Sequence, residues 1–501
     1  MRVLLINSNT RDDLLAAPPL GLCYVATAAE AAGHQVQVLD LCFARGKERR
    51  AVGQATRVFS PDVIGVSVRN IDNCNMLYPE FYLPHIRRIS GYIRQVTGVP
   101  LVVGGSGASL CPGEILNYLG ANYVVVSDGE ESFVQLLAVL ETGRSPEAIP
   151  GVGMMREGRF HLTPPTRTGF PAGDPHLDSW IDLRPYYRMG SGYSIQTKRG
   201  CRQRCIYCTY NQSLEGSGIR FRAPVEVVDE LEEVLRKHHP PTFDFVDSVF
   251  NDPLEHSVEI LEEIIRRPWR AHLTTMGVNP LNLDRAYLDL MWRAGFRSFM
   301  ITPESASGAM LRNYRKGFGP EDVARAAGRI HETGFATWWY FMVGGPGETN
   351  ATLQESLDFA TRHLASDGRR GSTVAHFFLG VRMYPGTQLW EMGLQEGQIP
   401  EGADPLQLIW YLSRDLDLAR ALDQMARAAA SRPGIYLGSD DRILRFSRTL
   451  ASVCRILGRA GPYWRYFSGT NLMRRLAGVR LMYRSEDLAR WAKGSPKGQG
   501  P

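Results

Sequence analysis

The chain has 501 residues, enough for two or three domains, and its content of 44% hydrophobic and 22% charged residues is ordinary for a soluble globular protein. The first residues, MRVLLINSNT, are typical of a buried strand and not of a signal peptide, and the longest apolar stretch, residues 335–345, is too short to cross a bilayer. The net charge of +5 is uneven, because residues 441–501 carry 13 Lys and Arg against 3 Asp and Glu. We therefore expect a cytoplasmic enzyme with no membrane partner.

Residues 1–143 alternate between strand and helix signals. Short apolar runs predict strands at residues 2–7, 36–41, 61–68, 100–105 and 122–129, and helical spacing predicts helices at 19–33, 84–97 and 114–119. Strands separated by helices indicate a doubly wound, Rossmann-like parallel sheet of the α/β class. Ligands of such sheets bind at the carboxyl ends of the strands, which here carry residues 7–9, 69–70, 104–106 and 128–130.

Residues 144–190 are rich in Pro, Gly and turn residues, and they predict a linker. A second alternating pattern in residues 191–400 predicts strands at 193–198, 243–248, 271–276, 298–304, 338–345 and 376–382. Six βα units indicate a partial (β/α)6 barrel of the TIM type, whose chemistry is at the strand carboxyl ends.

Residues 401–501 show no clear strand signal and predict a helical C-terminal region with a basic, partly disordered tail. A basic segment can attract phosphate, nucleic acid or an acidic carrier domain, and it can equally be solvated helical surface. We expect no nucleic-acid partner, and a carrier protein stays a candidate partner.

Three of the eight cysteines are clustered, in Cys201-Arg-Gln-Arg-Cys205-Ile-Tyr-Cys208. Three thiolates on one tight loop can each bind one iron of a [4Fe–4S] cluster and leave the fourth iron open to a substrate or cofactor. Structural zinc is the alternative, but it is usually closed by four ligands, and no nearby His or Cys completes such a set. In a chain of this length the pattern favours a metal site over a disulfide framework.

The cysteine motif and the segments after it resemble the radical S-adenosylmethionine (SAM) domain. The further matching segments are residues 245–251, 302–305, 343–349 and 382–387. The last two include Gly344-Gly345-Pro346-Gly347-Glu348-Thr349 and Arg382-Met-Tyr-Pro-Gly-Thr. The resemblance implies a [4Fe–4S] cluster on the three cysteines and SAM contacts from Tyr207, Asn251, Glu304, Ser305, Gly344, Gly345, Pro346 and Arg382. Thr302 and Pro303 depart from the family's Gly-x-Glu-Ser pattern. Lys198 and Arg199 either pair with the SAM carboxylate or are solvated.

Residues 1–143 resemble the cobalamin (B12)-binding domain that precedes many radical SAM domains. The matching segments are Pro18-Pro19-Leu20-Gly21-Leu22, Gly33-His34-x-Val36, Pro61-Asp62-x-x-Gly65-x-Ser67, Val103-Gly104-Gly105 and Asp128-Gly129-Glu130-Glu131. The implied cobalamin contacts are Asn7, Leu20, Ser67, Arg69, Asn70, Gly104, Gly105, Ser106, Asp128, Gly129 and Glu130. Small residues at these places let the backbone approach a large corrin.

Arg69 is a candidate catalytic residue. The Asp-x-His-x-x-Gly run that supplies an axial histidine in other B12 enzymes does not occur in the sequence, and residues 1–143 hold only His34 and His85. Arg69 follows the third predicted strand, so we expect it near the lower face of the corrin. A guanidinium cannot ligate cobalt and would leave the metal without a strong lower ligand, which favours methyl departure. The alternative for Arg69 is a salt bridge to Asp72 or a phosphate contact.

Together these features resemble the class B radical SAM methyltransferases, which are cobalamin-dependent. The resemblance implies that methyl passes from SAM through methylcobalamin to an unactivated carbon of a biosynthetic small molecule, with an external electron donor of the flavodoxin or ferredoxin type. A cobalamin-dependent rearrangement, cyclisation or oxidation is the alternative, and a non-catalytic B12-binding sensor is a lesser one. A tRNA methylthiotransferase is disfavoured, because its N-terminal domain needs a second three-cysteine cluster.

Overall fold

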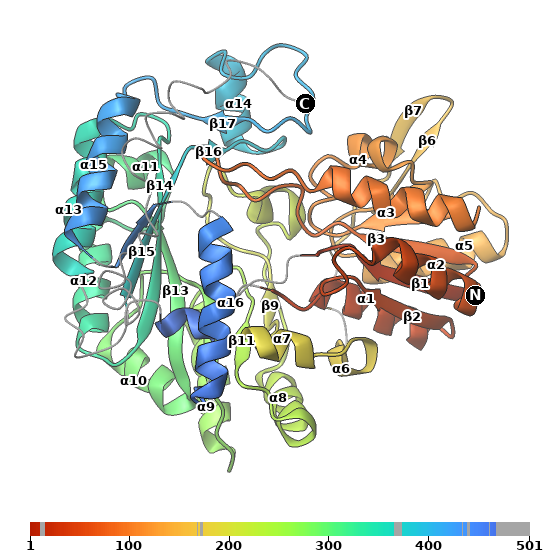
Figure 1. Cartoon of the computed structure of the whole chain (residues 1–501), viewed down its shortest axis with the longest axis horizontal. Helices are drawn as coiled ribbons and strands as arrows, with labels where there is room; N and C mark the ends of the chain where they lie inside the picture. Colours follow the sequence, from red (N-terminus) through yellow and green to blue (C-terminus); the bar gives the residue numbers. More distant parts are fainter. Residues whose placement is uncertain are drawn as a thin grey trace.

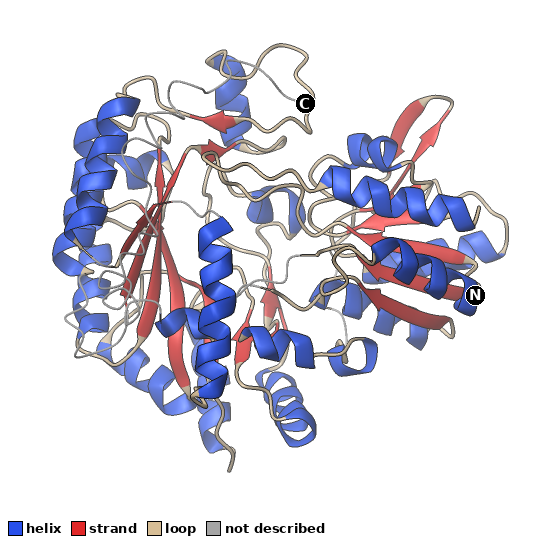
Figure 2. Ribbon diagram, viewed as in Figure 1, coloured by secondary structure: helices blue, strands red, loops and turns tan. Residues whose placement is uncertain are grey.

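The computed structural model describes residues 1–10, 16–167, 169–170, 174–364, 373–432, 434–437, 441–459 and 461–466 (Figure 1). It shows two α/β units, each built on a mainly parallel sheet with helices on both sides (Figure 2). Of the predicted basic segment, residues 441–501, the part after residue 466 is outside the described residues. Within the described part of the chain, no helix combines the length and apolar character needed to cross a membrane.

The first sheet has the strand order β2-β1-β3-β4-β5-β6-β7. Its parallel strands are β1 (Arg2–Asn7), β2 (Gln35–Asp40), β3 (Val63–Ser67), β4 (Leu101–Gly104) and β5 (Tyr123–Val125). Alternate side chains of β1 enter different cores: Val3 and Leu5 pack with α1 (Leu20–Ala31) and α5 (Glu130–Glu141). Leu4 and Ile6 pack with the helices of the opposite face, α2 (Glu48–Phe59), α3 (Leu83–Val96) and α4 (Pro112–Leu119). This confirms the predicted doubly wound sheet.

Residues 144–190, predicted as a linker, contain further elements of structure. Strands β6 (Val152–Arg156) and β7 (Arg159–Leu162) form a hairpin that extends the first sheet by antiparallel pairing with β5. Its two-residue turn, Glu157-Gly158, has positive φ at both positions, as a tight hairpin requires. Two short helices follow, α6 (Leu177–Trp180) and α7 (Arg184–Met189). The sequence analysis missed the hairpin because its turn lacks the usual Asn-Gly or Asp-Gly pair.

The second sheet is parallel throughout, with the order β18-β15-β14-β13-β12-β11-β8. Its strands are β8 (Tyr193–Ile195), β11 (Phe243–Phe245), β12 (Leu273–Val278), β13 (Phe296–Glu304), β14 (Ala336–Val343), β15 (Thr373–Leu379) and β18 (Ile435–Leu437). The helices between and after them are α8 (Pro224–His238), α9 (Leu254–Arg266), α10 (Arg285–Ala294), α11 (Gly308–Asn313), α12 (Pro320–His331), α13 (Asn350–His363), α14 (Gln388–Gln395) and α15 (Leu418–Ser431). The first six strands coincide with the six predicted ones.

The prediction that residues after 401 lack strands was wrong. Strand β18 extends the barrel sheet beside β15, and β17 (Trp410–Tyr411) pairs with β16 (Val381–Arg382). Both are too short to carry a periodic signal, and they acquire partners only when distant segments meet. The helical part of the expectation holds for α15 and for α16 (Asp441–Ile456), which lies across the front of the barrel in Figure 1.

Two short antiparallel strands carry the chain across the barrel mouth. Strand β9 (Lys198–Arg199) pairs with β10 (Arg220–Phe221), and the loop between them holds the three clustered cysteines and a short π-helix, η1 (Tyr210–Leu214). The loop therefore starts and ends at one place on the barrel, at the carboxyl end of β8.

Candidate functional site

A cavity of about 610 Å³ lies between the two sheets and is open to both. The residues of the first sheet that line it, among those predicted to bind cobalamin, are Asn7, Leu20, Ser67, Arg69, Gly104, Gly105, Ser106, Asp128, Gly129 and Glu130. From the barrel, the predicted residues Cys201, Cys205, Tyr207, Cys208 and Glu304 line the same cavity. Residues from two separate motifs, one in each domain, thus share one cavity.

The cysteine loop is held close to the barrel by backbone contacts. Gly200, which precedes the first cysteine, has φ +99°, and a Cβ there would overlap the carbonyl oxygen of Gly218. The amide of Cys201 donates to the carbonyl of Gly216 over 3.2 Å. Cys201 and Cys205 are buried, and Cys208 is half-buried. The loop thus places all three cysteines on the cavity wall.

The donor set suits a [4Fe–4S] cluster better than a single ion. All eight cysteines lie in the described part of the chain, and none is in a disulfide. Among the described residues, no three His, Cys, Asp or Glu side chains converge on one metal position. A cubane needs no such convergence, because each thiolate binds a different iron. Burial raises the pKa of the Cys201 thiol to about 12, so binding of a cluster releases protons.

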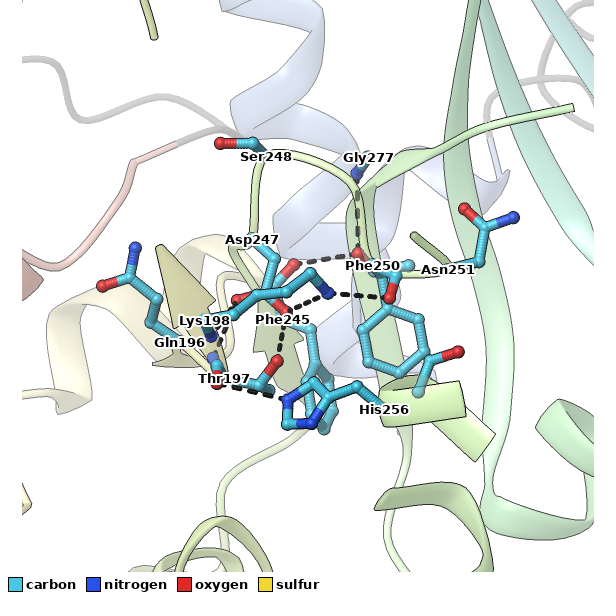
Figure 3. Close-up of polar contacts among 12 residues, drawn as sticks. Gln196, Thr197, Lys198, Phe245, Asp247, Ser248, Phe250, Asn251, His256 and Gly277 are labelled. Carbon is cyan, nitrogen blue, oxygen red and sulfur yellow. Dashed lines mark hydrogen bonds and ion pairs between the residues drawn. The ribbon is translucent and has the colours of Figure 1, made fainter. Parts of the chain in front are cut away.

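A buried ion pair supports the strand that leads into the cysteine loop (Figure 3). The Lys198 amine lies 3.6 Å from the Asp247 carboxylate and donates to the carbonyl of Phe250 over 2.9 Å. The same carboxylate accepts from the backbone amide and hydroxyl of Thr197, over 2.7 and 2.6 Å. Burial lowers the pKa of the Lys198 amine, and Asp247 opposes this shift. Lys198 therefore joins β9 to the segment after β11.

Arg199 bridges the two domains. Its guanidinium donates to Glu130 over 2.7 Å and lies 3.1 Å from Asp128. Asp128 also accepts from Arg220 over 2.6 Å. Both Lys198 and Arg199 are thus paired within the protein, which leaves neither as a solvated side chain. Asp128 and Glu130 line the cavity with their charges already balanced.

Next to the cysteine loop, Tyr207, Glu304 and Lys316 form a connected group. Glu304, the last residue of β13, has φ +67°, a left-handed conformation that is uncommon outside glycine and marks a constrained position. Its carboxylate accepts from the Tyr207 hydroxyl over 3.0 Å and lies 3.4 Å from the Lys316 amine. Burial raises the pKa of Glu304, and Lys316 opposes this shift. All three residues line the cavity.

The remaining predicted SAM contacts and Asn70 do not line the cavity. Asn251 donates to the carbonyls of Asn279 and Leu281, and Ser305 bonds Ser356 over 3.0 Å. The amides of Gly344 and Gly345 donate to Glu348, and Pro346 accepts from Asn313. Arg382 bonds Asp72 of the first domain over 2.9 Å. For these residues a contact with SAM stays a prediction. The structure shows them in hydrogen bonds within the protein.

The edge of the first sheet is built closely around Arg69. A Cβ on Gly105 would lie 2.7 Å from the carbonyl of Val68, so glycine is needed for the β4 loop to reach the β3 loop. Ser106 donates to the Arg69 carbonyl over 2.7 Å. The Arg69 side chain is exposed to the cavity, and Asp72, its predicted alternative partner, bonds Arg382 instead. Small residues at this edge suit a ligand as broad as a corrin.

Sequence reasoning missed several residues of the cavity wall, including Tyr210, Glu215, Asp244 and Lys316. Asp244 had a usable signal, because an acid between Phe243 and Phe245 in a buried strand must face the barrel interior. Lys316 had none, since its position depends on how the segment after β13 folds back.

Two family models match the chain. The Radical SAM superfamily matches residues 195–360, and the B12 binding domain matches residues 14–137. The "Tryptophan 2-C-methyltransferase" of Streptomyces laurentii is 28% identical over 76% of this chain and 73% of its own length. The "Cytidylyl-2-hydroxyethylphosphonate methyltransferase" of Streptomyces wedmorensis is 22% identical over 72% and 77%.

Solved structures of the radical SAM methyltransferase TsrM from Kitasatospora setae superpose on this chain with a TM-score of 0.82, at 25% identity, over 95% of this chain and 99% of theirs. One contains cobalamin and a [4Fe–4S] cluster, and another contains tryptophan substrate and a SAM analog. The chain is therefore an enzyme with a B12-binding domain and a radical SAM domain, homologous to the cobalamin-dependent radical SAM methyltransferases.

Proposed function

We propose that the protein transfers a methyl group from SAM, by way of cobalamin, to a carbon atom of a biosynthetic small molecule. The observation that carries this proposal is the shared cavity. The cysteine loop of the barrel and the strand ends of the first sheet line one space of about 610 Å³, so groups held by the two domains would meet there. A sensor that only bound cobalamin would need no cysteine loop in that space.

Specific residues fit the three groups. Cys201, Cys205 and Cys208 would hold the cluster, and the polar group of Tyr207, Glu304 and Lys316 would hold SAM beside it. Arg69 and the small residues at the edge of the first sheet would hold cobalamin. When bound, the cluster supplies single electrons and cobalamin supplies a cobalt that carries methyl. The chain binds and orients these groups and shields them from bulk water.

Tryptophan is the first substrate to assay, because it is named for two of the relatives described above. We further propose a reducing, cytoplasmic location and an external electron donor of the flavodoxin or ferredoxin type, since an exposed cluster is oxygen-sensitive and must be reduced. A carrier protein that presents the substrate is the remaining partner candidate, and titration of the assay with free substrate would reveal it.

The test is an anaerobic assay of the reconstituted enzyme with tryptophan, a strong reductant and SAM labelled with ¹³C in its methyl group. We expect labelled methyl on a carbon of the product and one S-adenosylhomocysteine for each product formed. One 5′-deoxyadenosine in addition would indicate methylation at an sp3 carbon, and none would indicate polar methylation. Deoxyadenosine without S-adenosylhomocysteine would favour the rearrangement, cyclisation or oxidation alternative. A Cys205→Ala protein is the control for cluster-dependent turnover.

A further inference from the structure

Asp244 is the middle residue of β11, on the wall of the cavity. Its neighbours Phe243 and Phe245 are fully buried in the barrel core, so Asp244 points to the opposite side, into the barrel interior. In the sheet it lies opposite Ser194 of β8 and Thr274 of β12. The side chain is partly exposed, and it faces the cavity. Asp247 and Ser248, which follow the strand, line the same cavity.

Asp244 differs from every other acid on the cavity wall. The other five, each of which accepts a hydrogen bond or forms an ion pair within the protein, are Asp128, Glu130, Glu215, Asp247 and Glu304. Oxygen Oδ1 of Asp244 is buried and accepts no hydrogen bond in the described structure. A buried carboxylate oxygen without a donor destabilises the fold, and most such groups in native proteins have a partner. A missing partner at a ligand site points to a donor on the ligand.

The charge that acts on Asp244 comes from across the cavity. Burial raises the pKa of Asp244 to about 7, and Arg69 at the end of β3 opposes this shift. Within the described residues the two side chains form no ion pair within 4.0 Å, and both line the cavity. Both residues therefore border the space that a ligand would occupy.

The part of the cavity wall that the barrel supplies combines polar and apolar groups. Polar side chains come from Ser194, Gln196, Asp247 and Ser248. Apolar side chains and aromatic rings come from Val246, Val249, Met276, Tyr210 and Phe318. A ligand with an apolar body and one donor would match this wall, and a nitrogen-borne donor is the strongest partner for a carboxylate.

We propose that Asp244 is a substrate-binding residue that accepts a hydrogen bond from a nitrogen, an ammonium or a ring N–H, carried on an apolar ring of the substrate. The proposal rests on the proposed function, because it assumes that the substrate enters this cavity. It narrows the substrate to nitrogenous aromatic compounds, and it assigns a specificity role to a residue that none of the sequence motifs includes.

The experiment measures binding of small probes by calorimetry to the enzyme loaded with cluster and cobalamin. The first pair of probes is indole and benzofuran, which have the same shape but of which only indole has an N–H. The second pair is benzylamine and benzyl alcohol, which differ in an ammonium and a hydroxyl. We expect the wild-type enzyme to prefer indole to benzofuran, or benzylamine to benzyl alcohol, by about tenfold or more. The first preference would identify a ring N–H, and the second an ammonium. In Asp244→Leu the preference should disappear.

Three results would overturn the proposal: no preference in the wild-type enzyme, a preference that persists in Asp244→Leu, or loss of cobalamin from that variant. The last would assign the donor to an amide of the corrin. The cobalamin content and the cluster absorbance of Asp244→Leu are therefore measured first, and both should equal those of the wild-type enzyme.

A stability measurement separates a binding role from a structural one. Because Asp244 lacks a partner, Asp244→Leu and the more conservative Asp244→Asn should unfold at the same temperature as the wild-type enzyme or higher at pH 8. Asp247→Leu is the matched control and should unfold earlier, since Asp247 accepts hydrogen bonds from Thr197. If both Asp244 variants unfold early, the acid is structural and the proposal fails. Methylation of tryptophan without any probe preference would refute the role of Asp244 alone. A probe preference without methyl transfer from SAM to any nitrogenous aromatic compound would refute the proposed function alone.

Discussion

The guanidinium of Arg382, in β16 just after the sixth barrel strand, donates a hydrogen bond over 2.9 Å to the carboxylate of Asp72 in the first domain. The hydroxyl of Tyr384 donates to the other oxygen of the same carboxylate over 3.0 Å. Asp72 follows Arg69 by three residues, so the barrel holds the loop that carries Arg69. This contact joins the radical SAM motif around Arg382 to the cobalamin side of the cavity, although the two segments are 310 residues apart.

Replacing Arg382 by Leu should strongly destabilise the enzyme. Both members of the pair are buried, and removal of one leaves an uncompensated charge, which costs about 3–5 kcal/mol. Thermal unfolding, followed by circular dichroism, measures the loss. Arg184→Leu is the control, because Arg184 pairs with Asp182 on the surface and its loss should not shift the unfolding temperature. Equal unfolding temperatures for Arg382→Leu and wild type would contradict this account of the pair.

Replacing Cys205 by Ala should abolish the visible absorbance and the electron paramagnetic resonance signal of the reduced cluster, since each thiolate holds one iron. The same holds for Cys201 and Cys208. Cys23→Ala is the control, because Cys23 is fully buried in the hydrophobic core and does not line the cavity. A cluster of normal iron content in Cys205→Ala would show that the motif is not its ligand set.

Arg69→His should change the spectrum of bound cobalamin in the Co(II) state. If Arg69 lies beneath cobalt, the wild-type enzyme should lack the superhyperfine splitting that a nitrogen ligand adds, and the imidazole of Arg69→His can introduce it. Arg69→Lys is the charge-conserving comparison and should show no splitting. Splitting already present in the wild-type enzyme would mean that a nitrogen ligand reaches the metal and that Arg69 has another role.

Glu348 should make stability depend on pH. Burial raises its pKa from 4.5 to about 7, although the hydrogen bonds that it accepts from the amides of Gly344 and Gly345 lower the pKa. Between these two values the folded state binds more protons than the unfolded state, so stability decreases as pH rises toward 7 and stays lower above it. Glu348→Gln lacks this titration. The unfolding temperature of the variant relative to wild type should therefore increase from pH 5 to pH 8, and a constant difference would exclude the shift.

The two sheets and the cysteine loop could be predicted from the sequence, because their signals are local. Apolar runs such as residues 2–7 and 338–345 show which segments are buried strands, and the three cysteines lie within eight residues of each other. The expected ligand edge of the first sheet and the cysteine loop then proved to share one cavity. Two features were not predicted: the β6–β7 hairpin, whose turn lacks the usual Asn-Gly or Asp-Gly pair, and β18, which acquires a partner only when residues 435–437 meet β15.

Which polar side chains remain available to ligands depends on contacts between distant segments. Arg199, Lys198 and Arg382 are equally plausible ligand contacts in the sequence, and each is paired with an acid from a distant segment. Asp244 looks like one more acid in the sequence, and it is the one on the cavity wall without a donor among the described residues. The reason is physical, because burial makes an unpaired charge costly. Whether a side chain is available to a ligand therefore depends on the partners that folding brings to it. Partners more than 45 residues apart in the chain leave no local pattern in the sequence.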